Sequence, residues 1–167
     1  EETARELKGE DVPLEIHSSL NLGLDLRIPP SYIADEHQRL RAYKRIADIP
    51  DSGHAAKVLA EMEDRYGPVP GQVKSLAEFA LIKSTAQRMG IESIDRRQGM
   101  LNIKFHKDSR VQAAALMNLV RKTAGAQFTP AGVLRIPVTP GGEPSHLLGF
   151  LSAQLLQLDA QESSLRQ

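Results

Sequence analysis

Apolar side chains change their spacing twice along this 167-residue chain. From residue 14 to 28 they alternate with polar neighbours, which is the period of an extended strand. From residue 35 to 90 they recur every three or four positions, which is the period of helices buried on one face. After residue 90, alternating and helical runs follow one another again. This order predicts an α+β fold, with a helical first half packed with a small, mainly antiparallel sheet and further helices.

Three helices are expected in the first half. The first, over residues 35–49, is predicted to bury Leu40, Tyr43, Ile46 and Ala47. The second covers residues 52–66 and begins at a cap on Asp51 or Ser52. The third begins near Pro70 and ends at Met89 before Gly90, and apolar residues around most of its circumference make it the central helix. Four core residues are expected on the second and third helices: Leu59, Met62, Phe79 and Ile82.

The second half is expected to begin with a hairpin that turns at Gln98–Gly99. A helix capped by Asp108 and stopped by Gly125 follows, then a hairpin around residues 130–132, and a final helix over residues 145–158. We expect residues 1–12 to form a linker or the frayed end of a preceding helix, residues 13–158 to form one domain, and residues 159–167 to form a polar tail.

The charge balance and the residue types exclude several classes of protein. The 21 basic residues are balanced by 21 acidic ones, so no global field favours a polyanionic partner. The chain has no cysteine, which excludes disulfides, thiolate metal sites and a cysteine nucleophile. No apolar run approaches the roughly 18 residues of a membrane span, so we expect no membrane partner and a cytoplasmic location.

Motifs for catalysis are missing from the sequence. The five histidines are scattered singly and do not have the spacing of metal ligands: His17, His37, His54, His106 and His146. There is no phosphate-binding loop of the P-loop type and no nucleophile motif of the G-x-S-x-G type. We therefore expect this chain to have no catalytic residue, no bound metal and no cofactor of its own.

Charged residues gather near the end of the second helix. Glu61, Asp64 and Arg65 fall together on the side opposite the apolar stripe, with Lys57 beside them. Pairs four residues apart, Lys57 with Glu61 and Glu61 with Arg65, are predicted to form a ladder that adds little to helix stability. Gly67 and the prolines after it end the helix abruptly. This pattern is typical of an ordinary solvated face, and also of a rigid patch that binds another protein surface.

A second charged run lies on the first helix. Arg39, Arg41, Lys44 and Arg45 are candidates for contacts to a nucleic-acid backbone. Stacking on bases would require a free aromatic side chain, but Tyr43 lies on the apolar stripe. A solvated helix face remains the alternative.

Two longer stretches, "LDLRIPPSYIADEHQRLRAYKRIA" and "EMEDRYGPVPGQVKSLAEFALIKSTAQRMGI", resemble the C-terminal domain of the bacterial transcription-repair coupling factor (Mfd) family. The resemblance covers roughly residues 13–105 and includes the positions Tyr32, Ile33, Asp35, Arg39, Leu40, Tyr43, Lys44, Arg45, Ile46, Ala47, Glu61, Asp64, Arg65, Tyr66, Gly67, Pro70 and Gly90. The chain departs from the family pattern at Ala34, Glu63 and Tyr66, where the family has proline, an apolar residue and, more commonly, phenylalanine.

The resemblance implies a parent protein that is an ATP- and magnesium-dependent translocase on double-stranded DNA. Such a protein displaces stalled RNA polymerase and recruits the repair protein UvrA. It also implies that residues 13–158 are a non-catalytic regulatory clamp, which packs against the UvrA-binding domain and the motor domains of the same chain. Residues 1–12 would then be the linker from the preceding motor domain. Glu61, Asp64 and Arg65 are then expected to make that contact. The alternative is a nucleic-acid-binding accessory module that uses Arg39 to Arg45.

Overall fold

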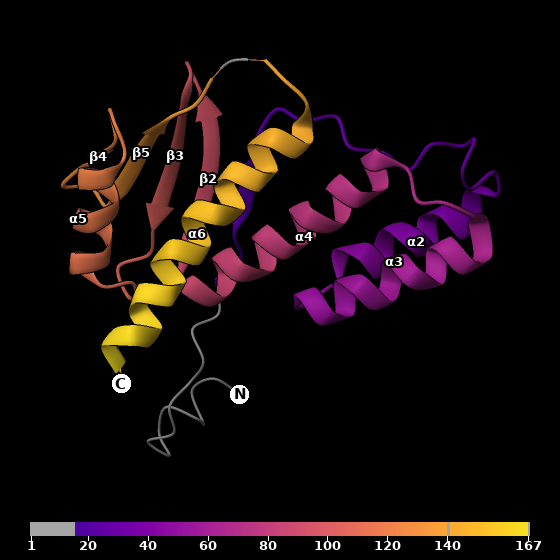
Figure 1. Ribbon diagram of the computed structural model, residues 1–167, viewed down its shortest axis with the longest axis horizontal. Helices are drawn as coiled ribbons and strands as arrows, with labels where there is room; N and C mark the ends of the chain where they lie inside the picture. The colour runs from indigo at the N-terminus through magenta and orange to yellow at the C-terminus, as the bar shows by residue number, and fades with distance from the viewer. Residues whose placement is uncertain (1–15, 140, 167) are drawn as a thin grey trace.

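The computed structural model describes residues 16–139 and 141–166. The described helices are α2 (Glu36–Ala47), α3 (Ser52–Tyr66), α4 (Gly71–Met89), α5 (Ala113–Lys122) and α6 (Pro144–Arg166). The strands are β1 (Ser19–Asn21), β2 (Ile91–Arg97), β3 (Met100–Phe105), β4 (Gln127–Phe128) and β5 (Val133–Pro137). The sheet lies at one end with α5 and α6, α2 and α3 lie at the other, and α4 runs between the two ends (Figure 1). The predicted α+β class is confirmed.

The five strands form one sheet in the order β1-β2-β3-β5-β4. Three of the four pairings are antiparallel, and only β1 runs parallel to its neighbour β2. The β2–β3 turn lies at Gln98 and Gly99 as predicted, and both have positive φ angles, 52° and 74°. Two successive residues in that region form the two-residue turn that matches the twist of a hairpin.

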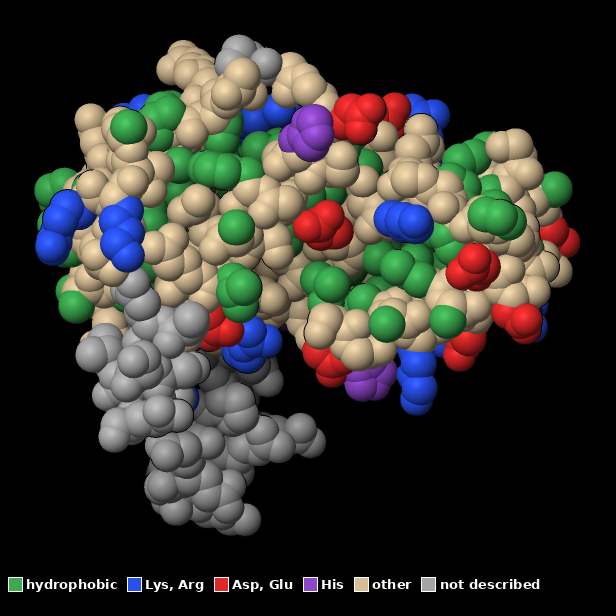
Figure 2. All heavy atoms as spheres, in the orientation of Figure 1, with side chains coloured by type: hydrophobic (Ala, Val, Ile, Leu, Met, Phe, Trp, Pro, Cys, Tyr) green, Lys and Arg blue, Asp and Glu red, His purple; other side chains and the backbone are tan. Residues whose placement is uncertain are grey.

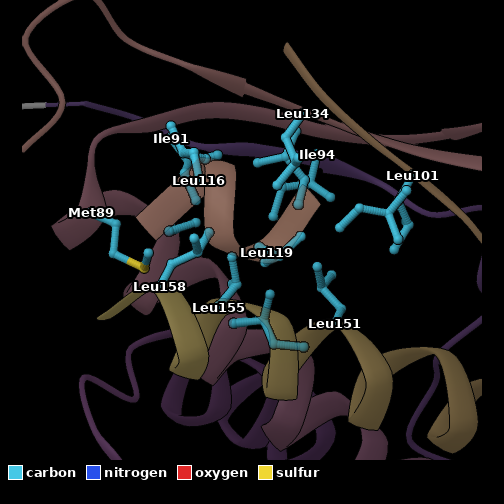
Figure 3. Close-up of a cluster of buried hydrophobic side chains, with 14 of the residues drawn as sticks. Met89, Ile91, Ile94, Leu101, Leu116, Leu119, Leu134, Leu151, Leu155 and Leu158 are labelled. Atoms are coloured by element: carbon cyan, nitrogen blue, oxygen red, sulfur yellow. The ribbon is translucent and has the colours of Figure 1, made fainter. Parts of the chain in front are cut away.

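One hydrophobic cluster fills the space between the sheet and the helices α4, α5 and α6. Alternate residues of β3 and β5 point into it, among them Leu101, Ile103, Leu134 and Ile136. Leu151, Leu155 and Leu158 of α6 approach from the opposite side (Figure 3). Since all these side chains are excluded from water, this cluster is the main apolar core of the sheet end.

A second cluster lies between α2, α3 and the first half of α4. It includes Ile46 of α2, Met62 of α3 and Val73 of α4, all buried. The buried apolar residues of α4 up to Ala80 belong to this cluster, while those from Ile82 to Met89 belong to the sheet cluster. α4 is therefore the shared central element, as its apolar circumference predicts.

The cap predicted for the second helix is Asp51, and the first helix has a cap of the same kind at Asp35, which was not predicted. The Asp35 carboxylate accepts hydrogen bonds from the backbone N–H groups of His37 and Gln38, and Asp51 accepts one from His54. The bond from Gln38, followed by that from His37, lowers the pKa of Asp35, and the bond from the His54 backbone lowers that of Asp51. These bonds explain why α2 and α3 begin close to the predicted positions.

The predicted buried face of α2 is partly wrong. Leu40 is 55% exposed and Ala47 is exposed, whereas Ala42 and Ile46 are buried. A stripe through Leu40 and a stripe through Ala42 both have the spacing of a helix face. The prediction chose the stripe through Leu40 because its side chain is larger. The partner helices select the stripe that includes the small Ala42, because a small side chain lets the helices approach closely.

The predicted core of α3 and α4 is confirmed in part. Met62 and Ile82 are buried, at 5% and 2% exposure, while Leu59 and Phe79 are only half-buried. Leu59 and Phe79 lie at the margins of the two clusters, so each is covered on one side only.

The extended segment at residues 14–28 pairs over a shorter length than predicted. Only Ser19–Asn21 joins the sheet, although Leu22 and Ile28 are buried in the expected alternation; Leu14 lies outside the described residues. Alternation reports one-sided burial, which does not require a paired strand.

Two helices in the second half have other boundaries than predicted. α5 begins at Ala113, and its N-cap residue is Gln112, whose side chain makes no capping hydrogen bond. The predicted cap at Asp108 is therefore wrong. The Asp108 N–H instead donates to Nδ1 of His106 in the preceding turn. α6 continues to Arg166, through most of the segment expected to form a tail, and the predicted linker at residues 1–12 lies outside the described residues.

Candidate interaction surface

The C-terminal end of α3 is fixed by a residue from the loop before α2. The Tyr32 hydroxyl lies 3.1 Å from the carbonyl oxygen of Met62 and 2.9 Å from that of Gly67, and its one proton is shared between these two acceptors. Its ring meets the ring of Tyr66 edge-on, with 5.7 Å between the centroids. Burial raises the pKa of the Tyr32 hydroxyl, which moves its ionisation further from neutral pH. The last turn of α3 is thus held in one position.

The carboxylate of Glu61 contacts α2 rather than its own helix. It accepts a hydrogen bond from the Arg45 guanidinium, and this bond is the largest cause that lowers the pKa of Glu61. Within the described part of the chain, the predicted ladder pairs with Lys57 and Arg65 do not form as ion pairs. Lys57 and Arg65 still act on Glu61 through their charge. The ladder prediction is wrong because the neighbouring helix supplies a cation that the sequence spacing does not show.

Asp64 and Arg65 are exposed on the last turn of α3, directly before the fixed end. Neither forms an ion pair with another residue that the structure describes. The three residues predicted for an interdomain contact are therefore all at the surface, but Glu61 is already engaged.

The four basic residues predicted for nucleic acid do not lie on one face. Arg39 donates to the backbone carbonyls of Ile33 and Ala34, at 3.0 and 3.3 Å, and so fixes the loop before α2. Arg45 binds Glu61, whereas Arg41 and Lys44 are exposed. Tyr43 accepts a hydrogen bond from the backbone N–H of Ile28 at 2.7 Å, which agrees with a core position.

A groove of about 430 Å³ lies between α2 and α3. Arg41 and Arg45 line it from α2, and Glu61 and Arg65 line it from α3. The half-buried ring of Tyr66 contributes apolar surface, whereas Met62 lies almost completely covered at the bottom. Sequence analysis assigned these charged residues to two separate sites. The signal it missed is the spacing: positions 38, 41, 42 and 45 and positions 58, 61, 62 and 65 repeat the same face on two consecutive helices.

The α2–α3 end carries charges of both signs at its surface. Acidic and basic side chains lie among apolar ones over this end in Figure 2. In the residues that the structure describes, no three His, Cys, Asp or Glu side chains come together as a site for a metal ion. Among the same residues, no helix has the length and apolar character needed to cross a membrane.

Known proteins resemble this chain in sequence. A transcription-repair-coupling factor of Rickettsia bellii (strain RML369-C) is 31% identical over 112 residues, which cover 67% of this chain and 10% of that protein. The protein of the same name from Myxococcus xanthus is 28% identical over 131 residues, covering 78% of this chain and 11% of that protein. The transcription-repair-coupling factor of Escherichia coli (strain K12) is 29% identical over 118 residues, which cover 68% of this chain and 10% of that protein. The chain thus spans about a tenth of the length of these relatives.

The fold has a counterpart among solved structures. A crystal structure of the C-terminal domain of transcription-repair coupling factor matches 90% of this chain and 97% of the other, with a TM-score of 0.79 and 22% identity. That likeness shows a shared fold. The family model for the TRCF domain matches residues 22–116, which hold α2, α3, α4 and the β2–β3 hairpin. The chain belongs to the TRCF domain family.

Proposed function

We propose that this chain is a non-catalytic interaction domain of a cytoplasmic transcription-repair coupling factor, and that it docks onto the UvrA-binding domain of the same protein. The end of α3, with Asp64 and Arg65 exposed and Glu61 beside them, is the contact surface. In this proposal the parent protein supplies the ATP- and magnesium-dependent motor and the binding of DNA, RNA polymerase and UvrA. The docked domain hides the UvrA-binding surface and restrains the motor.

The observation that supports this most directly is the fixed end of α3. Tyr32 anchors the last turn through Met62 and Gly67, although Asp64 and Arg65 on that turn have no ion-pair partner among the described residues. A rigid element loses little conformational entropy when its charged side chains bind a partner. Charges that become desolvated in an interface also discriminate strongly between partners.

The test compares UvrA affinity and DNA-free ATPase rate in the parent protein. The variants are Asp64→Ala with Arg65→Ala, and a truncation that lacks residues 13–167. Loss of a desolvated charge pair costs about 2 kcal/mol or more, so the open state should rise by roughly thirtyfold while it stays the minor state. We expect both variants to bind UvrA more tightly and to hydrolyse ATP faster than wild type. Lys74→Ala, an exposed cation on α4, is the control and should behave like wild type.

Each contrary result has a distinct meaning. If the truncation is activated while the double variant behaves like wild type, the domain restrains the parent through another surface. If neither is activated, the domain does not restrain the parent. Fluorescence anisotropy of a labelled DNA duplex tests the alternative: strong, salt-sensitive binding by this chain would favour a nucleic-acid module.

A further inference from the structure

We infer that the groove between α2 and α3 is a binding site for a carboxylate side chain, presented by an acidic partner segment that also carries an apolar residue. Arg41 and Arg65, on opposite walls of the groove, are the residues that bind it. The identification of the partner segment as part of the UvrA-binding domain rests on the proposed function. The chemistry of the groove does not, because it follows from the residues that line it.

The groove is built from two helices that face each other along the same spacing. Arg41 comes from the middle of α2 and Arg65 from the last turn of α3, and both are exposed. Between them the surface of Met62 and Val58 is almost completely covered, and the ring of Tyr66 is half-buried. The site thus combines cationic walls with a floor whose exposed apolar part is the ring of Tyr66, within about 430 Å³.

The charges in the groove are unbalanced. Three arginines face it, against one glutamate, so it carries a formal excess of two positive charges. Glu61 compensates Arg45 directly. Among the described residues, neither Arg41 nor Arg65 forms an ion pair or a side-chain hydrogen bond of its own. A guanidinium binds a carboxylate through two parallel hydrogen bonds, which favours such a ligand over a single-point contact.

A localised carboxylate fits these surroundings better than a nucleic-acid backbone. A phosphodiester chain needs a continuous track of cations. Here Glu61, Glu63 and Asp64 lie on the same two turns of α3, and Asp35 and Glu36 lie at the start of α2. These carboxylates would repel a chain of phosphates that extends beyond the groove. A single carboxylate next to an apolar side chain uses both the arginines and the floor.

Glu61 acts in this site as a positioning residue. Its carboxylate holds the Arg45 guanidinium and so withdraws one of the three cations from the ligand. The variant Glu61→Gln removes one negative charge from the groove and releases Arg45. We therefore expect Glu61→Gln to bind an acidic ligand more tightly than wild type does, by about 1.5- to fivefold if one guanidinium is regained.

The first test uses two peptides and backbone amide NMR shifts of this chain. The probe is acetyl-Leu-Glu-Glu-Leu-amide, and the matched neutral peptide is acetyl-Leu-Gln-Gln-Leu-amide. We expect the acidic peptide alone to shift amides around Arg41 and Arg65. Arg41→Gln should abolish most of the effect, Glu61→Gln should strengthen it, and Lys44→Gln, on the same helix but outside the groove, should leave it unchanged. Equal shifts from both peptides, or shifts that persist in Arg41→Gln, would overturn the inference.

The second test measures docking of the separate UvrA-binding domain of the parent protein. Arg41→Glu places a carboxylate where the ligand's own carboxylate would lie, so docking should weaken by about thirtyfold or more. If Arg41→Glu docks like wild type while Asp64→Ala does not, the inference fails and the proposed function stands. If the peptide result holds but the domain does not bind wild type, the proposed function fails and the carboxylate site stands. Arg41-dependent shifts caused by a short DNA duplex and not by the acidic peptide would identify a phosphate site instead, and would overturn the inference.

Discussion

Tyr32 connects the loop before α2 to the end of α3. Its hydroxyl contacts the carbonyl oxygens of Met62 and Gly67, which lie 30 and 35 residues further along the chain. The family resemblance includes this tyrosine, but no spacing in the sequence shows what its hydroxyl binds. The contact joins the end of α3 at Gly67 to the loop before α2. The Gly67 N–H caps the helix by donating to the carbonyl of Glu63, and the Tyr32 hydroxyl adds a side-chain contact at the same helix end.

The first prediction concerns that hydroxyl. Tyr32→Phe keeps the ring contact with Tyr66 but leaves the two carbonyl oxygens without this donor, so it should lower the free energy of unfolding by about 1 kcal/mol. Urea denaturation of both proteins measures the difference. Tyr66→Phe, which changes the other ring of the same pair, is the control and should cost less. Equal losses in the two variants would show that the hydrogen bonds of Tyr32 contribute nothing special.

The second prediction concerns the caps of α2 and α3. The pKa values of Asp35 and Asp51 are lower in the folded state because backbone N–H groups bind the carboxylates. A lowered folded pKa means that the stabilisation is complete above the unfolded value, about 3.9, and is lost as pH falls through the folded value. Asn accepts the same cap bond but does not titrate.

Asp35→Asn should therefore be less stable than wild type at neutral pH and equally stable in strong acid. Urea melts at a series of pH values, from about pH 7 down to about pH 2, measure this difference. A difference that stays constant over the whole range would show that the charge of Asp35 does not interact with the start of α2.

Among the elements, helices that begin and end at capping residues, glycines or prolines were the easiest to predict. α3 and α4 have the predicted boundaries, because Asp51, Gly67, Pro70 and Gly90 act locally. The start of α5 was not predictable in this way, since it has no side-chain cap. The face of α2 was also mispredicted, because Leu40 and Ala42 both belong to helical stripes and only the neighbouring helices decide between them.

The same limit applies to the candidate site. Sequence periodicity placed Glu61, Asp64 and Arg65 on the surface, which the structure confirms. It could not show that Arg45 lies across from Glu61, because that depends on how α2 packs on α3. Sequence spacing paired Glu61 with cations on its own helix α3, although the cation that binds it, Arg45, is on α2.

The third prediction concerns the turn between α5 and β4. Gly125 has a φ of 79°, and a Cβ there would lie 2.8 Å from Cγ of Pro137 on the adjacent strand. Gly141 has a similar φ of 83° but nothing within 4 Å of the same position. Gly125→Ala should thus cost the backbone strain of about 1 to 2 kcal/mol and a further overpacking cost of at least about 1 kcal/mol. Gly141→Ala should cost the strain alone, as measured by thermal or urea unfolding; a larger loss for Gly141→Ala would contradict this account.

At the scale of the whole molecule, α4 joins two hydrophobic clusters of unequal strength. Among the described residues, the sheet cluster holds 17 buried apolar residues and the α2–α3 cluster holds 11, of which four are alanines. Alanine buries much less apolar area than leucine or isoleucine, so the α2–α3 cluster contributes less to stability. This inequality was not visible in the sequence, because both halves have helices with well-formed apolar stripes.

The last prediction is that the α2–α3 end opens before the sheet end. Amide protons of α2 and α3 should exchange at a lower free energy of opening than those of β2 and β3, as measured by hydrogen exchange with mass spectrometry. Met62→Ala, a core truncation that costs about 2 to 5 kcal/mol, should lower the opening free energy mainly in α2 and α3. Ile82→Ala truncates the sheet cluster on the shared helix α4, so it should lower protection at both ends. If Met62→Ala lowers protection equally in β3, the molecule opens only as one unit.

If the α2–α3 end opens first, that local opening would also disrupt the α2–α3 groove. Docking at that groove should therefore raise the protection of amide protons in α2 and α3, while the protection of β2 and β3 remains unchanged.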